Sequence, residues 1–131
     1  MEAQYYTPSL SEFHIGFEFE AKEPDSDKWL PFTFTSFQSL NHIHGLIEAG
    51  CVRVKRLDAD DIVGCGWGES KTQKSQYRHI KYEQQHCWLM FMPENEKNVS
   101  IGCGWTNYFL GTIRNKSELL DQMQRCGIEA K

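Results

Sequence analysis

Two stretches of alternating apolar and polar residues, joined by a polar turn, constrain this chain more than any other feature. Residues 13–20 read FHIGFEFE, with Phe or Ile at each odd position. Residues 22–28 (KEPDSDK) are typical of a turn, and residues 29–35 (WLPFTFT) alternate again. A period of two indicates a strand with one buried face, so the pattern predicts an antiparallel hairpin. Pro31 has no amide hydrogen, which favours a sheet edge for the second strand.

The same reasoning predicts the remaining elements up to residue 114. Apolar residues at helical spacing predict a helix over residues 39–49, which Gly50 ends. Asp58 starts a short second helix, and Asp61 completes its capping pattern. Residues 68–76 are polar and are expected to form a mobile connection. Further strands are predicted over residues 51–57, 77–83, 86–92, 99–103 and 107–114.

The clearest helix closes the chain. Asn115 is its expected N-cap, Glu118 completes a capping box, and Gly127 with Ile128 fits a Schellman ending. In total the chain predicts an α+β fold, in which an antiparallel sheet of about seven strands packs with two or three short helices, including the C-terminal helix. A length of 131 residues suits one compact domain over residues 1–131.

Charge and hydropathy exclude several classes of protein. Residues 1–50 hold eight acids and two bases, residues 51–85 hold seven bases and five acids, and the net charge is −4. This balance lacks the basic stripe of a duplex-binding domain. The longest strictly apolar run, residues 88–92, is far shorter than a membrane span, and the opening residues MEAQYYTPSL contain no apolar leader. We therefore expect a soluble cytoplasmic protein.

Cysteine and histidine do not form a recognisable metal motif. The five cysteines are odd in number, so free thiols are expected instead of a disulfide framework. No Cys-x-x-Cys pair is present, and neither a metal site nor a cofactor is predicted. The sequence leaves open whether four residues converge on a metal site or a reactive site. They are Cys65, Cys103, His79 and His86.

Catalytic patterns are weak throughout the chain. Cys65 and Cys103 lie between glycines, but neither begins a predicted helix that would lower a thiol pKa. Glu18 and Glu20 lie two apart on one strand face, which is also the pattern of a solvated face. The sequence GCGW occurs twice, at 64–67 and 102–105, yet its flanks differ and no structural repeat is predicted. These observations favour a role without catalysis.

One segment, residues 67–82, combines lysine and arginine with aromatic residues. Cationic side chains can bind phosphate and aromatic rings can stack on nucleobases, so this combination would suit the binding of single-stranded nucleic acid. A solvated loop has a similar composition, and the acidic net charge opposes this interpretation. The candidate binding residues of this segment are Trp67, Lys71, Lys74, Tyr77, Arg78 and Lys81.

Several phrases in one order resemble a known group of proteins. They are YYTP (5–8), EFHIGFEFE (12–20), VRVK (52–55), LD and DI (57–58 and 61–62), GW (66–67), LGTI (110–113), NKSEL (115–119) and GI (127–128). Together they resemble small uncharacterised proteins of phages and prophages of Bacteroidetes, over about a third of the chain. The resemblance implies a viral origin and an accessory role, and it brings no activity, cofactor or catalytic residue with it.

The sequence and the resemblance together predict a non-enzymatic, phage-type accessory protein that binds another macromolecule. The expected partner is a host or viral protein, and the expected location is the cytoplasm of the host cell. The alternative is a small protein that binds single-stranded nucleic acid or a nucleotide through residues 67–82. The oligomeric state is left open.

Overall fold

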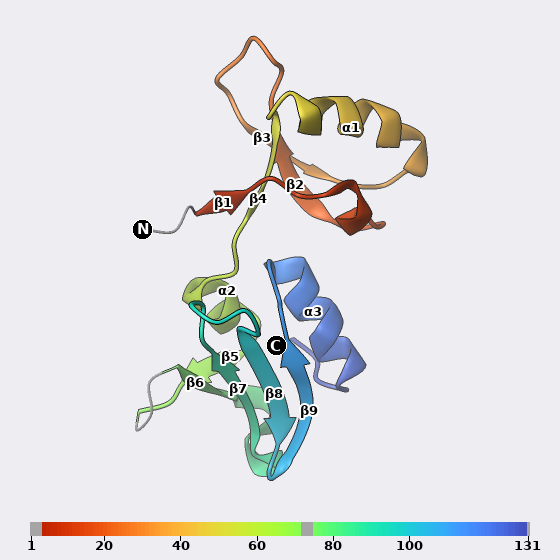
Figure 1. Ribbon diagram of the computed structural model, residues 1–131. Helices are drawn as coiled ribbons and strands as arrows, with labels where there is room; N and C mark the ends of the chain where they lie inside the picture. The colour runs from red at the N-terminus through yellow and green to blue at the C-terminus, as the bar shows by residue number, and fades with distance from the viewer. Residues whose placement is uncertain (1–3, 72–74, 131) are drawn as a thin grey trace. The chain divides into compact units, whose positions relative to one another are not determined.

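The computed structural model describes residues 4–71 and 75–130 of the chain (Figure 1). The chain divides into two compact units, Met1–Arg56 and Leu57–Lys131. Each unit has its own sheet, and the two hydrophobic core clusters draw on separate halves of the sequence. None of the helices in the described ranges is long and apolar enough to cross a membrane.

Within its described residues, the first unit contains a four-stranded antiparallel sheet in the order β1-β4-β2-β3. Its elements are β1 (Tyr5–Tyr6), η1 (Leu10–Glu12), β2 (Glu18–Ala21), β3 (Leu30–Thr33), η2 (Phe37–Ser39), α1 (Leu40–Glu48) and β4 (Val52–Lys55). Figure 1 shows α1 across one face of this sheet. The buried core of the unit consists of Phe13, Phe17, Ala21, Phe34, Ile43, Val52 and Val54.

The predicted N-terminal hairpin is confirmed, although its first strand is shorter than expected. β2 pairs with β3, which lies at the sheet edge, and Pro31 is opposite Glu20. Residues 14–17 form a turn in which the Phe17 amide donates to the His14 carbonyl at 2.9 Å. Gly16 has φ +94°, a conformation that side chains disfavour. Ile15 therefore lies in a turn and is exposed, so the predicted alternation from residue 13 is wrong for its first half.

The helix and strand that follow the hairpin are confirmed. α1 spans Leu40–Glu48, and Gly50 after it has φ +73°. In β4, Val52 and Val54 are buried, while Arg53 and Lys55 between and after them are half-buried. The alternation read from the sequence is therefore the alternation of the two faces of this strand.

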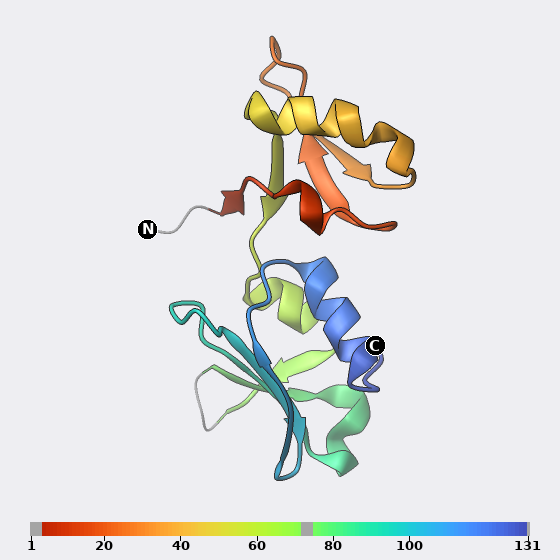
Figure 2. The ribbon, with the colours of Figure 1, turned by 45° about the vertical axis from the view of Figure 1, so that its right-hand side comes forward.

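Within the described part of the second unit, a five-stranded antiparallel sheet has the order β5-β6-β7-β8-β9. The elements are α2 (Ala59–Gly64), β5 (Trp67–Glu69), β6 (Gln76–His79), η3 (Ile80–Gln85), β7 (Cys87–Phe91), β8 (Val99–Cys103), β9 (Thr106–Gly111) and α3 (Lys116–Arg125). Figure 2 shows α2 and α3 on the same side of the sheet. Leu89 and Ile101, opposite each other on β7 and β8, are fully buried on that side.

Both helices of the second unit begin and end as local chemistry requires. Asp58 and Asp61 form the expected capping box of α2. At the end of α3, the Ile128 amide donates to the Met123 carbonyl at 2.8 Å, and Gly127 has φ +76°. This is the Schellman geometry that the sequence predicted.

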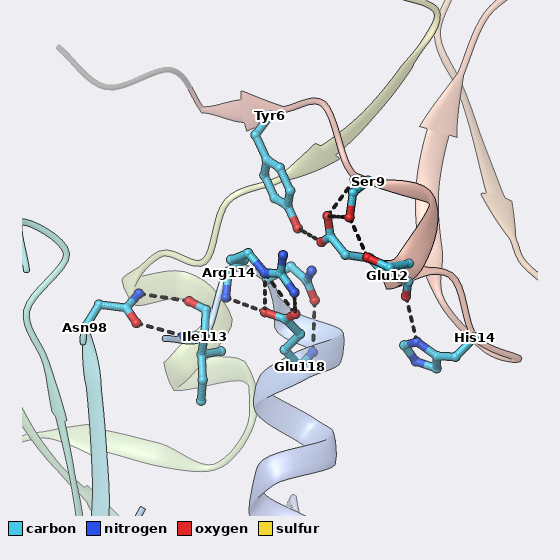
Figure 3. A network of polar contacts seen from close by, with 10 residues as sticks. Tyr6, Ser9, Glu12, His14, Asn98, Ile113, Arg114 and Glu118 are labelled. Atoms are coloured by element: carbon cyan, nitrogen blue, oxygen red, sulfur yellow. Dashed lines mark hydrogen bonds and ion pairs between the residues drawn. The ribbon is translucent and has the colours of Figure 1, made fainter. Parts of the chain in front are cut away.

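The start of α3 differs from the predicted capping box in one detail. The Asn115 side chain accepts from the Glu118 amide at 2.9 Å, as expected of an N-cap. The Glu118 carboxylate, however, accepts from the Arg114 amide at 2.6 Å, one residue earlier than a capping box requires (Figure 3). Its second oxygen accepts from the Arg114 guanidinium at 3.0 Å, so this ion pair draws the carboxylate one residue further back.

The α+β class and the antiparallel pairing are confirmed, but the strands do not form one sheet of about seven. In the described residues they form two sheets, of four and five strands. The change of sheet follows β4, because the α2 helix begins four residues after it and every later strand pairs with its neighbour in sequence. The expectation of one domain over residues 1–131 stays a prediction.

Two predictions for the middle of the second unit need correction. The strand predicted over residues 77–83 ends at His79, where the ring Nδ1 accepts from the Lys81 amide at 3.2 Å and starts the 3₁₀ helix η3. The polar connection predicted over residues 68–76 begins as part of β5, which extends to Glu69. The remainder of that connection includes residues 72–74, which lie outside the described residues.

Candidate binding surface

The second sheet has one face that α2 and α3 do not cover. Alternation along the strands directs Leu89 and Phe91 of β7 into the core, so Trp88 and Met90 point to the other side. Residues directly opposite each other on neighbouring strands point to the same side of a sheet, so the cross-strand partners of Trp88 and Met90 lie on this side as well. We call this side the open face, and its members on β6 to β9 are Gln76, Arg78, Trp88, Met90, Ser100, Gly102, Asn107 and Leu110.

The open face has apolar side chains on both sides of β8, while Ser100 and Gly102 of β8 itself are buried. Leu110 is opposite Ser100, which is opposite Met90, so the two apolar side chains flank a small central residue. Leu110 is 53% exposed although it belongs to a sheet. Because β8 contributes only Ser100 and Gly102 to this face, larger side chains stand on either side of a low central strand.

Trp88 packs against Gly102 of β8, where no side chain would fit. A Cβ atom added at Gly102 would clash with the Thr106 carbonyl oxygen and would lie 2.5 Å from Cζ2 of Trp88. The indole Nε1 of Trp88 donates to the Gly104 carbonyl at 3.0 Å. One hydrogen bond and the contact with Gly102 therefore hold the ring, while part of the residue is exposed.

The turn between β8 and β9 presents Trp105 entirely to solvent. Cys103 pairs with Thr106, which leaves a two-residue loop of Gly104 and Trp105. Gly104 has φ +61°, as the first loop position of a type II′ hairpin requires. Trp105 is fully exposed, and Tyr108, at a bulge in β9, is 52% exposed. Two large, exposed aromatic residues thus lie in the β8–β9 turn and in the edge strand β9.

The charge around this surface is sparse. Residues 98–113 contain no Asp, Glu, Lys or Arg, although about a quarter of the whole chain is charged. Arg78 is opposite Trp88 on the neighbouring strand and is exposed, so it adds one cation to the open face. The surface is therefore apolar and aromatic with a cationic side.

The sequence-predicted binding residues that the structure describes do not all lie on one surface. Trp67 is fully buried, and its Nε1 lies 3.3 Å from the Met123 sulfur. Tyr77 is also buried, which raises the pKa of its hydroxyl, and the Glu69 carboxylate raises that pKa further. Neither ring is available to stack on a base.

The predicted cations of that segment have different surroundings. Lys81 pairs with Glu129 at 2.7 Å, which raises the pKa of the lysine and lowers that of the glutamate. Arg78 and Lys71 are exposed. Lys74 lies outside the described residues. Of the predicted residues that the structure describes on β6, only Arg78 lies on the open face.

The expectation of free thiols is wrong for two of the five cysteines. Cys87 and Cys103 are directly opposite each other on β7 and β8 and form a disulfide. The sequence could not show this pairing, because it depends on the register of two strands whose cysteines are 16 residues apart. Cys51, Cys65 and Cys126 are outside this bond.

The histidines and remaining cysteines do not gather into a metal site in the part of the chain that the structure describes. No group of three or more His, Cys, Asp or Glu side chains lies close enough to hold an ion there. His79 is fully buried and its Nε2 lies 3.2 Å from the Cys65 carbonyl oxygen, so the two predicted residues meet through the backbone. Burial lowers the pKa of His79, and the nearby Lys81 charge lowers it further. His86 is exposed at the start of β7.

Glu18 and Glu20, the two carboxylates on one face of the first sheet, have different surroundings. Glu20 accepts from Nε of Arg53 at 2.7 Å. The Arg53 guanidinium carbon lies 3.8 Å from the ring centre of Tyr5 and 4.3 Å from that of Trp29. Glu20 is therefore paired with the cation of a cation–π cluster, while Glu18 is exposed.

The first unit contains a separate, smaller groove. It has a volume of about 240 Å³ and lies between α1 and the β2–β3 hairpin. Phe32 and Leu30 of the edge strand are about half exposed at it, and His42 and Leu46 of α1 form the other wall. Its size suits one side chain of a partner, whereas the open face is a broad surface.

Comparison with known proteins adds no function. No protein-family model, curated protein sequence or solved structure matches the chain. The candidate surface therefore stands on its own geometry. Sequence reasoning missed its apolar members, and the signal that could have found them was the uncharged stretch over residues 98–113.

Proposed function

We propose that the protein is a non-enzymatic binding module that docks another protein on the open face and on the adjoining turn. The observation that supports this most is the fully exposed Trp105 in the turn between β8 and β9, two strands whose open face α2 and α3 do not cover. Exposed apolar patches of this kind mark interaction sites in proteins that otherwise bury such side chains. Trp, Tyr and Met are also the residue types that interfaces favour.

The proposed partner presents an apolar surface with little charge. A charged partner would lose hydration against residues 98–113 without gaining an ion pair from them. Arg78 is placed to meet an acceptor at the border of the interface. Truncation of a central aromatic residue in such an interface typically costs about 2 kcal/mol or more of binding free energy.

The test is a comparison of captured proteins between two lysine variants. Leu110→Lys places a charge in the open face, and Val63→Lys places the same charge at an equally exposed apolar position on α2. We expect the wild type and Val63→Lys to retain the same specific protein, and Leu110→Lys to bind it at least tenfold more weakly. Equal retention by all three, or no specific partner, would count against the proposal.

A second candidate function rests on the position of Arg78. Arg78 is opposite Trp88 on the open face, so a cationic side chain lies beside an aromatic ring. A protein that binds single-stranded nucleic acid needs this combination, because the cation binds phosphate and the ring stacks on a nucleobase. Titration of a labelled oligothymidine at two salt concentrations tests it. Binding that weakens with salt and is lost in Arg78→Ala would favour this candidate over the protein partner, and absence of salt-sensitive binding would remove it.

The phage origin and the host cytoplasm belong to the same proposal. In that setting the module would act by occupying a surface of a host or viral protein. Lysate of a Bacteroidetes host is therefore the first material for the capture experiment, with lysate of an unrelated bacterium beside it. Specific capture from the first lysate alone is the expected result.

A further inference from the structure

The Cys87–Cys103 disulfide joins β7 to β8 at the end of the hairpin opposite its connecting turn. β7 and β8 are connected through residues 92–98, so Cys87 begins the first strand and Cys103 ends the second. At this open end, no short loop holds the strands together. The disulfide supplies a covalent connection where the hairpin would otherwise separate most easily.

The turn that carries Trp105 is attached to the same end of β7. The Gly104 amide donates to the His86 carbonyl at 3.1 Å, and the Gly104 carbonyl accepts from Nε1 of Trp88 at 3.0 Å. His86 and Trp88 are the two neighbours of Cys87 in sequence, and Gly104 follows Cys103. One covalent bond and two hydrogen bonds therefore connect the same two short segments.

We propose that this disulfide is a redox control on the binding surface, since its state determines how firmly the Gly104–Trp105 turn is held against β7. The inference rests on the proposed function for its biological meaning, whereas the effect on the turn does not. When the bond is intact, the backbone of the turn and the Trp88 ring are held in one arrangement, so docking costs less conformational entropy. When the bond is reduced, no covalent link remains between these segments, and the turn is held only by the two Gly104 hydrogen bonds and by the pairing of β8 with its neighbouring strands.

The redox step is ordinary thiol–disulfide exchange with glutathione. A glutathione thiolate attacks the Cys103 sulfur, which is the more exposed of the pair, and forms a mixed disulfide while Cys87 leaves as a thiolate. A second glutathione thiolate attacks the glutathione sulfur, so that Cys103 leaves as a thiolate and glutathione disulfide forms. The protein gains two electrons and two protons, and two glutathione molecules are oxidised.

The test measures hydrogen exchange of the turn in both redox states of the full chain. We expect the amides of residues 104–108 to exchange roughly tenfold faster or more after reduction with glutathione, and to recover in glutathione disulfide. The variant with both Cys87→Ser and Cys103→Ser should match the reduced protein in either buffer. Cys126→Ser, which leaves the disulfide intact, should behave as the wild type.

Each result separates this inference from the proposed function. Equal exchange of residues 104–108 in the two redox states overturns the redox control, and so does failure of the bond to form in glutathione disulfide. Redox-dependent exchange with partner capture unaffected by Leu110→Lys would overturn the proposed function alone. If the double serine variant does not fold, the oxidised and reduced wild-type protein still decide the question.

Discussion

At the scale of single residues, burial gives the same short sequence two different roles. GCGW ends at Trp67 in one copy and at Trp105 in the other. Cys65 is the C-cap of α2, whereas Cys103 ends strand β8, so the two copies are not one structural unit, as their unlike flanks predicted. The first tryptophan fills the core of the second unit, and the second is fully exposed.

The two tryptophans therefore predict opposite results on truncation to alanine. Trp67→Ala should lower the free energy of unfolding by about 3–5 kcal/mol, because it leaves a large cavity in the core. Trp105→Ala should change it by less than about 0.5 kcal/mol while weakening partner capture. Urea denaturation of both variants checks the stability difference. A large loss of stability in Trp105→Ala would contradict its assignment as a docking residue.

His79 predicts a loss of stability on mild acidification. Its Nδ1 accepts from the Lys81 amide and its Nε2 therefore donates to the Cys65 carbonyl, so the fold requires the neutral ring. Because burial lowers the pKa of His79 in the folded protein, the unfolded chain binds a proton first as pH falls below about 6.5. The free energy of unfolding should decrease from there by up to about 1.4 kcal/mol per pH unit until the folded pKa is reached.

Urea denaturation at several pH values between 7.5 and 5.5 measures this slope. His79→Gln should flatten it, and His86→Gln, at an exposed position, should leave it as in the wild type. A slope that survives His79→Gln would show that another group is responsible for the acid sensitivity.

At the scale of elements, caps and strand edges decide where each segment begins and ends. Asn115 and Gly127 determine the two ends of α3 through one side chain and one positive φ. In the preceding segment, both side-chain amide atoms of Asn98 bond the Ile113 backbone at 2.8 Å, which leads the chain from β9 towards α3 (Figure 3). In the first unit, Glu12 accepts from the Tyr6 hydroxyl at 2.7 Å and caps η1 in the same local manner.

The N-cap of α3 predicts a measurable helix contribution. Asn115→Ala should lower the free energy of unfolding by about 1 kcal/mol or more, because the Glu118 amide loses its acceptor and the residue is buried. Asn115→Asp keeps an acceptor and should lose much less. Thermal denaturation of both variants distinguishes a capping role from a requirement for the amide itself, which equal losses would indicate.

At the scale of the whole molecule, two core clusters and one disulfide organise the chain. The residues of each cluster come from one half of the sequence, so each half of the chain builds its own core. The disulfide lies in the second unit, and Cys51 is the free cysteine of the first unit.

A count of thiols on the intact protein checks this arrangement. The denatured protein should react with a thiol reagent at three cysteines before reduction and at five after it, since Cys87 and Cys103 are joined. Mass spectrometry should also find a gain of two hydrogens on reduction. Five reactive thiols in protein kept under air would rule out the bond.

The sequence by itself determined the elements whose signals are local. Alternation predicted β4, alternation with a polar turn predicted the β2–β3 hairpin, and both ends of α3 followed from Asn115 and Gly127. Period and capping act between residues at most a few positions apart, so the chain carries them wherever it is placed. The early strand at Ile15 failed because Gly16 turns the backbone there.

Only the tertiary structure decided the division into two sheets, the disulfide and the open face. The pairing of Cys87 with Cys103 depends on strand register, and the exposure of Leu110 depends on which side α2 and α3 cover. Trp67 and Tyr77 were candidate binding residues in the sequence, and both are buried in the core of the second unit. A strand pattern shows that its two faces differ, and only the packing of other elements shows which face meets water.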